Sequence, residues 1–212
     1  VILTGNGRGF SAGGDVTAMG ADADNRSMTT KKHVTSAIQA FPRRMATFDK
    51  PIVAAVNGVA AGGGMDLALA CDFRTAGKSA KFVESYAKIG LLPGGGGAYF
   101  LPRIVGTAKA LELLLTADLI DAQQAKEIGL VNHVFEDADL LEETQKIAQR
   151  MAELPPYSVT KIKRTVYQGL QTDLFSALEM IGSHIAISKS SDDHAEAIAA
   201  FREKRKGNYT YE

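Results

Sequence analysis

An aspartate stands inside an otherwise apolar stretch, directly after three consecutive glycines. The stretch is VAAVNGVAAGGGMDLALACD, residues 53–72, with the glycines at 62–64 and the acid at Asp66. The residues before the glycines are typical of a buried strand, and those after them have helical character. A carboxyl group at such a junction suits acid–base chemistry if it faces a bound ligand.

A second glycine-rich turn has similar surroundings. It is SAGGD, residues 11–15, and it follows the apolar opening VILTG. Backbone N–H groups at the start of a helix are unpaired and carry the positive end of the helix dipole. Two such turns on neighbouring strands would aim two N–H donors at one oxygen, forming an oxyanion hole for an enolate or a tetrahedral intermediate. The alternative is that the glycines serve only tight turns and close helix packing, and the residues leave both open.

The sequence lacks the motifs of dinucleotide, phosphate, serine-nucleophile and metal sites. The dinucleotide fingerprint fails in LTGNGRGF because its last glycine position holds Phe10, and neither a phosphate-binding G-x-x-x-x-G-K-[ST] motif nor a G-x-S-x-G elbow occurs. The histidines are scattered and none has the spacing of a zinc ligand pair, so we expect no metal site. They are His33, His133, His184 and His194.

The charge balance and hydrophobicity of the sequence argue against some classes of binding partner. Among 212 residues, 24 basic side chains balance 24 acidic ones, so we expect no nucleic-acid partner. No apolar run reaches the roughly 18 residues that a membrane span needs, so we expect no membrane association either. The lone Cys71 lies in an apolar setting and indicates a reducing, cytoplasmic location. The chain opens on an apparent strand without a methionine, which predicts that an N-terminal segment is missing.

Strand and helix patterns alternate over residues 1–138 and predict a largely parallel α/β core. Asp121 is the predicted N-cap of one of its helices and Gly129 the predicted stop. Residues 139–212 instead predict a helical region, in which Asp173 and Asp192 are candidate N-caps. The strands are predicted at 1–5, 51–56, 72–77, 80–85 and 130–135. The helices are predicted at 30–48, 63–70, 94–106, 107–117, 121–129, 139–154, 156–169, 173–188 and 192–205.

Several blocks resemble, in order and spacing, the enoyl-CoA hydratase/isomerase (crotonase) family. They are VILTGNGRGFSAGGD, KPIVAAVNGVAAGGGMDLALACD, AKFVESYAKIGLLPGGGGAYFLPRIVG, DAQQAKEIGLVNHV and SDDHAEAIAAFREKRKGNY. The resemblance implies an α/β spiral of ββα turns with a C-terminal helical trimerisation region, assembled as a homotrimer or a dimer of trimers. The family's first strands, which contribute to the coenzyme A site, have no counterpart in this sequence.

The same resemblance implies an acyl-CoA thioester as substrate and no permanently bound cofactor, because coenzyme A enters as part of the substrate. The thioester carbonyl would lie between the backbone N–H groups of Ala12 and Gly63. The loop of Ala12, Gly13, Gly14 and Asp15 would lie near the adenine end of coenzyme A.

The acid–base pair departs from the family pattern. The family's hydratases carry a glutamate three residues after the oxyanion-hole glycine, and Asp66 occupies that position here. Their second glutamate corresponds to Tyr86, which suits orienting water or substrate, or donating a proton. Glu84 is a possible substitute, since in an extended strand it would share a side with Tyr86 at roughly 6 to 7 Å along the strand. Asp66 has the alternative role of a first-turn acid offsetting the helix dipole, and Tyr86 that of lining the acyl pocket.

The leading hypothesis is an enoyl-CoA hydratase (a lyase) or enoyl-CoA isomerase that stabilises a thioester enolate, with Asp66 as acid–base group. Two rivals stay open. One is another reaction on the same scaffold, such as decarboxylation or thioester hydrolysis. The other is a non-catalytic acyl-CoA-binding subunit.

Overall fold

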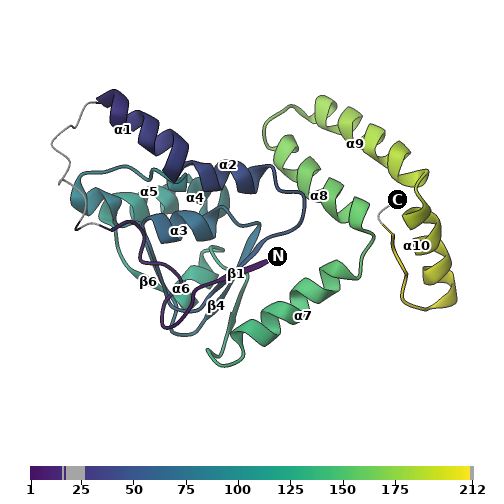
Figure 1. The fold of residues 1–212 in the computed structure, drawn as a ribbon, viewed down its shortest axis with the longest axis horizontal. Coiled ribbons are helices and arrows are strands. Elements are labelled where there is room, and N and C mark those ends of the chain that lie inside the picture. Colours follow the sequence, from purple (N-terminus) through teal and green to yellow (C-terminus); the bar gives the residue numbers. More distant parts are fainter. Residues whose placement is uncertain (16, 18–26, 211–212) are drawn as a thin grey trace. The chain divides into compact units, whose positions relative to one another are not determined.

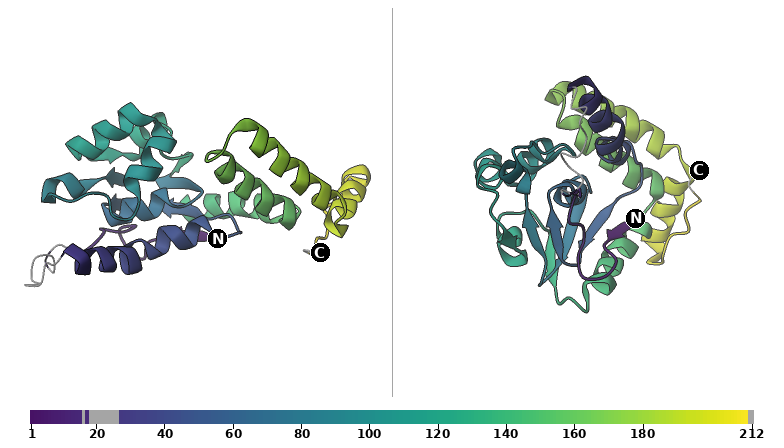
Figure 2. Two further views of the ribbon diagram at one scale, coloured as in Figure 1. Left: turned by 90° about the horizontal axis from the view of Figure 1, so that it is seen from above. Right: turned by 60° about the vertical axis from the view of Figure 1, so that its left-hand side comes forward.

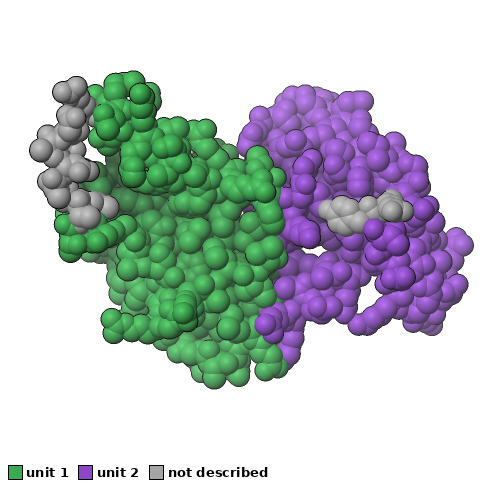
Figure 3. Space-filling view, in the orientation of Figure 1, with its two compact units in different colours: residues 1–48, 52–144 green, residues 49–51, 145–212 purple. Residues whose placement is uncertain are grey.

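The computed structural model describes residues 1–15, 17 and 27–210, and the chain divides into two compact units. The first unit comprises Val1–Phe48 and Ile52–Thr144, and the second comprises Asp49–Pro51 and Gln145–Glu212 (Figure 3). The domain boundary expected after residue 138 stays a prediction.

A four-stranded sheet forms the centre of the first unit, in the order β1-β2-β4-β7, with every neighbouring pair parallel (Figures 1 and 2). Its strands are β1 (Ile2–Thr4), β2 (Val53–Val56), β4 (Phe73–Gly77) and β7 (His133–Phe135). All four residues of β2 are buried, as expected for an inner strand of a parallel sheet that is covered on both faces. The predicted parallel core is therefore confirmed.

A second, smaller sheet has the order β3-β5-β6. Its strands are β3 (Val59–Ala61), β5 (Lys81–Val83) and β6 (Ile120–Asp121). β3 and β5 are parallel, whereas β5 and β6 are antiparallel. Neither β3 nor β6 was among the predicted strands. β3 follows β2 after only two residues, so the sequence does not separate the two, and the two residues of β6 are too few to show a periodic pattern.

The helices of the first unit follow the predicted segments in most places. They are α1 (Ser27–His33), the π-helical η1 (Val34–Ile38), α2 (Ala40–Ala46), α3 (Gly63–Leu69), the 3-10 helix η2 (Ser85–Ile89), α4 (Gly97–Val105), α5 (Thr107–Thr116) and α6 (Ala122–Glu127). The single helix predicted at 30–48 is wrong, because the chain forms three successive helical pieces there. Pro42 lies in the first turn of α2, where a missing N–H costs no helical hydrogen bond.

Local capping signals hold well in this unit. Asp121 caps α6 in a full capping box with Gln124, and Gly129 adopts the positive φ of 75° that ends the segment. Both predictions are confirmed. α4 and α5 pack against each other beside the small sheet, and Gly106, with a φ of 80°, makes the turn between them (Figures 1 and 2).

The second unit contains the helical C-terminal region. Its helices are α7 (Leu140–Ala152), α8 (Pro156–Gly169), α9 (Leu174–Lys189) and α10 (Asp192–Glu203), the first turn of α7 belonging to the first unit. Asp173 caps α9 as predicted, accepting from the N–H groups of Phe175 and Ser176. The N-cap predicted at Asp192 is wrong by one residue: Ser191 caps α10, and Asp192 is the first helical residue.

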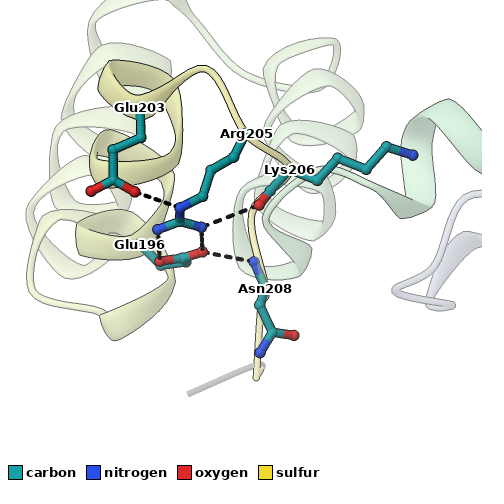
Figure 4. Close-up of polar contacts among 5 residues, drawn as sticks. All are labelled: Glu196, Glu203, Arg205, Lys206 and Asn208. Carbon is teal, nitrogen blue, oxygen red and sulfur yellow. Dashed lines mark hydrogen bonds and ion pairs between the residues drawn. The ribbon is translucent and has the colours of Figure 1, made fainter.

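The segment after α10 folds back onto that helix through a charged cluster (Figure 4). Arg205 pairs with Glu196 at 2.5 and 2.9 Å and with Glu203 at 2.6 Å, while the N–H of Asn208 also bonds to Glu196. The hydrogen bond from Arg205 lowers the pKa of Glu196 to about 2. The cluster is solvent-exposed and holds this local turn rather than a reacting group. In the described residues, no helix is both long and apolar enough to cross a membrane.

Candidate active site

The two glycine-rich turns predicted from the sequence lie side by side in the first unit. Ser11 forms a parallel bridge with Ala60, and its carbonyl accepts the N–H of Ala61 at 3.0 Å. A β-carbon at Gly13 would lie 3.0 Å from the backbone nitrogen of Gly63. The strand β3 therefore brings residues 11–14 against the start of α3.

Two backbone N–H groups at this junction are free to bind a ligand. Gly63 is the first residue of α3, and Gly62 before it has a φ of 49°, which turns the chain sharply into the helix. Within the described part of the chain, neither the N–H of Gly63 nor that of Ala12 has a hydrogen-bond acceptor. These are the two donors that the family resemblance implies for a thioester oxygen.

The third glycine of the triplet is fixed by packing. A β-carbon at Gly64 would overlap the carbonyl oxygen of Ser11, so only glycine lets the two turns approach this closely. Turn geometry and helix packing thus account for Gly64. They leave the free N–H of Gly63 without a structural role.

Asp66 lies one turn into α3 and is completely buried, with 0% of its surface exposed. Its Oδ2 accepts the hydroxyl of Tyr86 at 2.5 Å and the N–H of Gly95 at 2.9 Å. The carboxylate therefore receives donors from two other segments of the chain, rather than only offsetting the dipole of its own helix.

Tyr86 reaches Asp66 by a route that the sequence analysis did not foresee. The extended strand expected to carry both Glu84 and Tyr86 is wrong, because β5 ends at Val83 and Tyr86 belongs to the 3-10 helix η2. The turn brings the Tyr86 hydroxyl to 3.7 Å from the β-carbon position of Gly63. The hydroxyl therefore lies close to Gly63 at the start of α3 as well as to Asp66.

Glu84 also lies in the cluster. Its side chain is 1% exposed, and neither carboxyl oxygen has a hydrogen-bond partner in the described chain. A β-carbon at Gly97 would lie 2.5 Å from Oε1 of Glu84 and 2.5 Å from Oδ1 of Asp66. The two carboxyl groups thus face the same backbone position at the start of α4.

Burial is the largest cause of the pKa shifts of Asp66, Glu84 and Tyr86. It raises the pKa of Asp66, although the hydrogen bonds from Tyr86 and Gly95 and the nearby N–H of Gly97 act in the opposite direction. Burial, and then the charge of Asp66, raise the pKa of Glu84 to about 9. Burial, followed by the hydrogen bond to Asp66 and the carboxyl charges, holds the pKa of Tyr86 well above its ordinary value. Tyr86 therefore stays a neutral donor at neutral pH.

The glycine run at 94–97, predicted only as the start of a helix, also contributes to the site. Gly95 donates to Asp66, and a β-carbon there would lie 2.8 Å from Cζ of Phe41 and 2.7 Å from Oδ2 of Asp66. The signal was present in four consecutive glycines, since such a run indicates close approach of the backbone to another group.

The loop of Ala12, Gly13, Gly14 and Asp15 is exposed. The carboxylate of Asp15 accepts the N–H of Thr17 at 2.9 Å and its hydroxyl at 2.6 Å. The structure thus gives Asp15 a local partner on its own loop. Among the described residues, no group of three or more His, Cys, Asp or Glu side chains could hold a metal ion.

The whole chain, residues 1–212, matches the family model described as enoyl-CoA hydratase/isomerase. A crotonyl-CoA hydratase of Syntrophomonas wolfei is 39% identical over 210 residues, covering 99% of this chain and 79% of that protein. A 1,2-epoxyphenylacetyl-CoA isomerase of Escherichia coli is 35% identical over 210 residues, covering 99% of this chain and 80% of that protein.

Solved structures agree with the sequence comparisons. The crystal structure of an enoyl-CoA hydratase from Bacillus anthracis superposes with a TM-score of 0.93 at 35% identity, covering 100% of this chain and 81% of that one. This similarity confirms the α/β crotonase-type fold that the resemblance implied.

Replacement of Gly97 by alanine tests the packing of the carboxyl pair. We expect Gly97→Ala to lower the free energy of unfolding by about 1–3 kcal/mol, because the new methyl group overlaps both carboxyl groups. Gly94→Ala is the matched control: its nearest neighbour would be Ile38 at 3.5 Å, and we expect a change within about 0.5 kcal/mol. Urea unfolding measures both, and equal stability of the two variants would contradict the arrangement.

Proposed function

Since the chain belongs to the enoyl-CoA hydratase/isomerase family, we propose that it acts on an acyl-CoA thioester through an enolate. The reaction is the addition of water to an enoyl-CoA or the migration of its double bond. One observation carries this conclusion: a buried carboxylate and a tyrosine hydroxyl lie at the start of α3, where the two glycine-rich turns with free backbone N–H groups meet.

The N–H groups of Ala12 and Gly63 form the oxyanion hole in this proposal. Their adjacent segments and free donors support the assignment. As negative charge builds up on the thioester oxygen, two fixed donors stabilise it without having to reorient. Such a donor typically contributes about 3–4 kcal/mol to the transition state.

Asp66 is the group that moves the proton at carbon. Burial makes it a stronger base than an exposed aspartate, while the Tyr86 and Gly95 donors keep its ionised form accessible. In double-bond migration, Asp66 removes a proton from one carbon and returns it to another. In hydration, the oxygen of water adds at the β-carbon, Asp66 takes up the proton that the water loses, and this proton is then delivered to the α-carbon.

Tyr86 has a role in hydration that double-bond migration does not need. Its hydroxyl donates to Asp66, so its oxygen lone pairs remain available to accept a hydrogen bond from water. Tyr86 therefore orients the water during hydration. Migration needs only the one carboxylate, so the same site suits both reactions.

The remaining assignments rest on the family. The exposed loop of Ala12, Gly13, Gly14 and Asp15 binds the adenine end of coenzyme A, which arrives as part of the substrate and is not a resident cofactor. The lone buried Cys71 supports a cytoplasmic location.

Asp66→Asn tests the proposed acid–base group. The amide retains an acceptor for the Tyr86 hydroxyl and the Gly95 N–H but cannot take up a proton. We expect kcat for hydration of crotonyl-CoA to fall by about 10²–10⁴-fold with a small change in KM. A steady-state assay of the loss of the enoyl thioester measures both constants.

The wild-type protein decides between this function and its rivals. Absence of turnover with crotonyl-CoA, longer enoyl-CoAs and their 3-enoyl isomers would exclude the hydratase and isomerase reactions. Hydrolysis or decarboxylation of a thioester would then identify another reaction on this scaffold. Affinity for acyl-CoA without turnover would identify a non-catalytic binding subunit.

Tyr86→Phe tests the hydroxyl alone. Because the hydrogen bond from Tyr86 lowers the pKa of Asp66, its removal raises that pKa. We expect the acidic limb of the kcat/KM profile to move to higher pH, and kcat to fall by about 10–100-fold. Tyr99→Phe, at an exposed position of α4, is the control. An unchanged rate and profile would reduce Tyr86 to a lining of the acyl pocket.

A homotrimer or a dimer of trimers is the assembly that we propose. The second unit supports it, because several large apolar side chains there are exposed, Phe175 at 81% and Phe201 at 84%. Several of them lie on α9, and exposed apolar side chains that gather on one element indicate an association surface. The others include Leu170, Leu174, Leu178, Ile185 and Ile187.

Light scattering after size-exclusion chromatography tests the assembly. We expect a mass of three or six chains for the wild-type protein, because burying these side chains between copies removes apolar surface from water. Phe175→Glu should shift the mass toward one chain. A wild-type monomer at micromolar concentration would contradict the proposal.

A further inference from the structure

Glu84 is a buried acid for which the proposed reaction has no use so far. It follows β5, is 1% exposed, and has no hydrogen-bond partner for either carboxyl oxygen in the described chain. A buried carboxylate without donors is strongly unfavourable, so this group must be either neutral or compensated by a positive charge.

The charge that acts on Glu84 is that of another acid, Asp66. Glu84 and Asp66 each place an oxygen 2.5 Å from the same point, the β-carbon position of Gly97, so these oxygens are at most about 5 Å apart. Among the described residues, Tyr86 is the other titratable side chain that interacts with Asp66, and the start of α4 approaches both acids with the backbone of Gly97. In the described residues, no lysine, arginine or histidine pairs with either acid. Two negative charges this close would repel strongly, so the pair retains a proton.

The donors show which acid is ionised. Asp66 accepts the Tyr86 hydroxyl and the Gly95 N–H, and hydrogen bonds of this kind favour the charged form. Glu84 accepts none. The asymmetry places the negative charge on Asp66 and the proton on Glu84.

We propose that Glu84 is a positioning residue that holds a proton, which leaves Asp66 as the only ionised carboxyl group of the site. The role in turnover rests on the proposed function, whereas the protonation does not. Tyr86 and Glu84 flank Asp66, one near Gly63 and the other near Gly97. Asp66 exchanges one proton with the substrate, and Glu84 keeps its own. The raised pKa of Glu84, about 9, agrees with this assignment.

Proton linkage to folding tests the protonation without any assay of activity. Between the ordinary pKa of 4.5 and the folded value of about 9, native Glu84 holds a proton that the unfolded chain releases. Stability of the wild-type protein must therefore fall as pH rises through this window. We expect its unfolding constant to rise by about tenfold per pH unit relative to Glu84→Gln, measured by urea unfolding at about pH 6, 7 and 8.

Glu127→Gln, at an exposed site on α6, is the matched control and should show no such trend. A constant ratio between wild type and Glu84→Gln over this range means that native Glu84 is ionised, and overturns the proposal. If Glu84→Gln does not fold, infrared spectroscopy of the wild type decides. A band of a protonated carboxylic acid at neutral pH that persists in Asp66→Asn supports the proposal, and its absence overturns it.

The pH dependence of turnover tests the role. When Glu84 ionises, a second negative charge appears beside Asp66, so we expect kcat/KM of the wild type to fall at alkaline pH. Glu84→Gln should lose this alkaline limb. A limb that persists in the variant, or is missing from the wild type, overturns the role in turnover. If no enoyl-CoA is turned over, the proposed function fails, and the unfolding experiment still decides the protonation.

Discussion

A carboxylate that is cut off from water must find its hydrogen-bond donors within the protein, and Asp66 imposes this constraint on the whole site. Its donors come from η2, through Tyr86, and from the loop before α4, through Gly95. Neither segment is near α3 in sequence. The pairing of β3 with β5 and the packing of α3 against α4 supply these donors at the right place. The fold of the first unit thus stabilises one buried charge.

Space limits the site as strongly as charge does. At Gly64 a side chain would overlap the Ser11 carbonyl, and at Gly97 it would overlap both carboxyl groups. Glycine costs conformational entropy at each position, and a chain retains such residues where backbone and functional groups must approach closely. The glycine runs at 62–64 and 94–97 therefore belong to one arrangement, in which the first brings the turns together and the second accommodates the acids.

Much of the fold could be predicted, because it depends on local signals. The buried pattern of β2 and the capping box of Asp121 need no knowledge of distant residues. The placement of Glu84 could not be predicted in the same way. Extending the two-residue period of β5 past Val83 assumed a straight strand, but the chain turns into η2 there. Where a strand of three residues ends is decided by tertiary packing, which a single sequence does not display.

The position of the second acid matters for the chemistry that we propose. A tyrosine at position 86 places a neutral donor beside the proposed oxyanion hole, while the acid at position 84 faces Gly97 together with Asp66. Two ionised carboxylates facing an enolate would oppose its formation by repulsion. With the proton on Glu84, the site carries one negative charge, on Asp66, before the reaction. When the substrate gives its proton to Asp66, the negative charge moves from Asp66 to the enolate. The total charge of the site and its substrate therefore stays constant through the step.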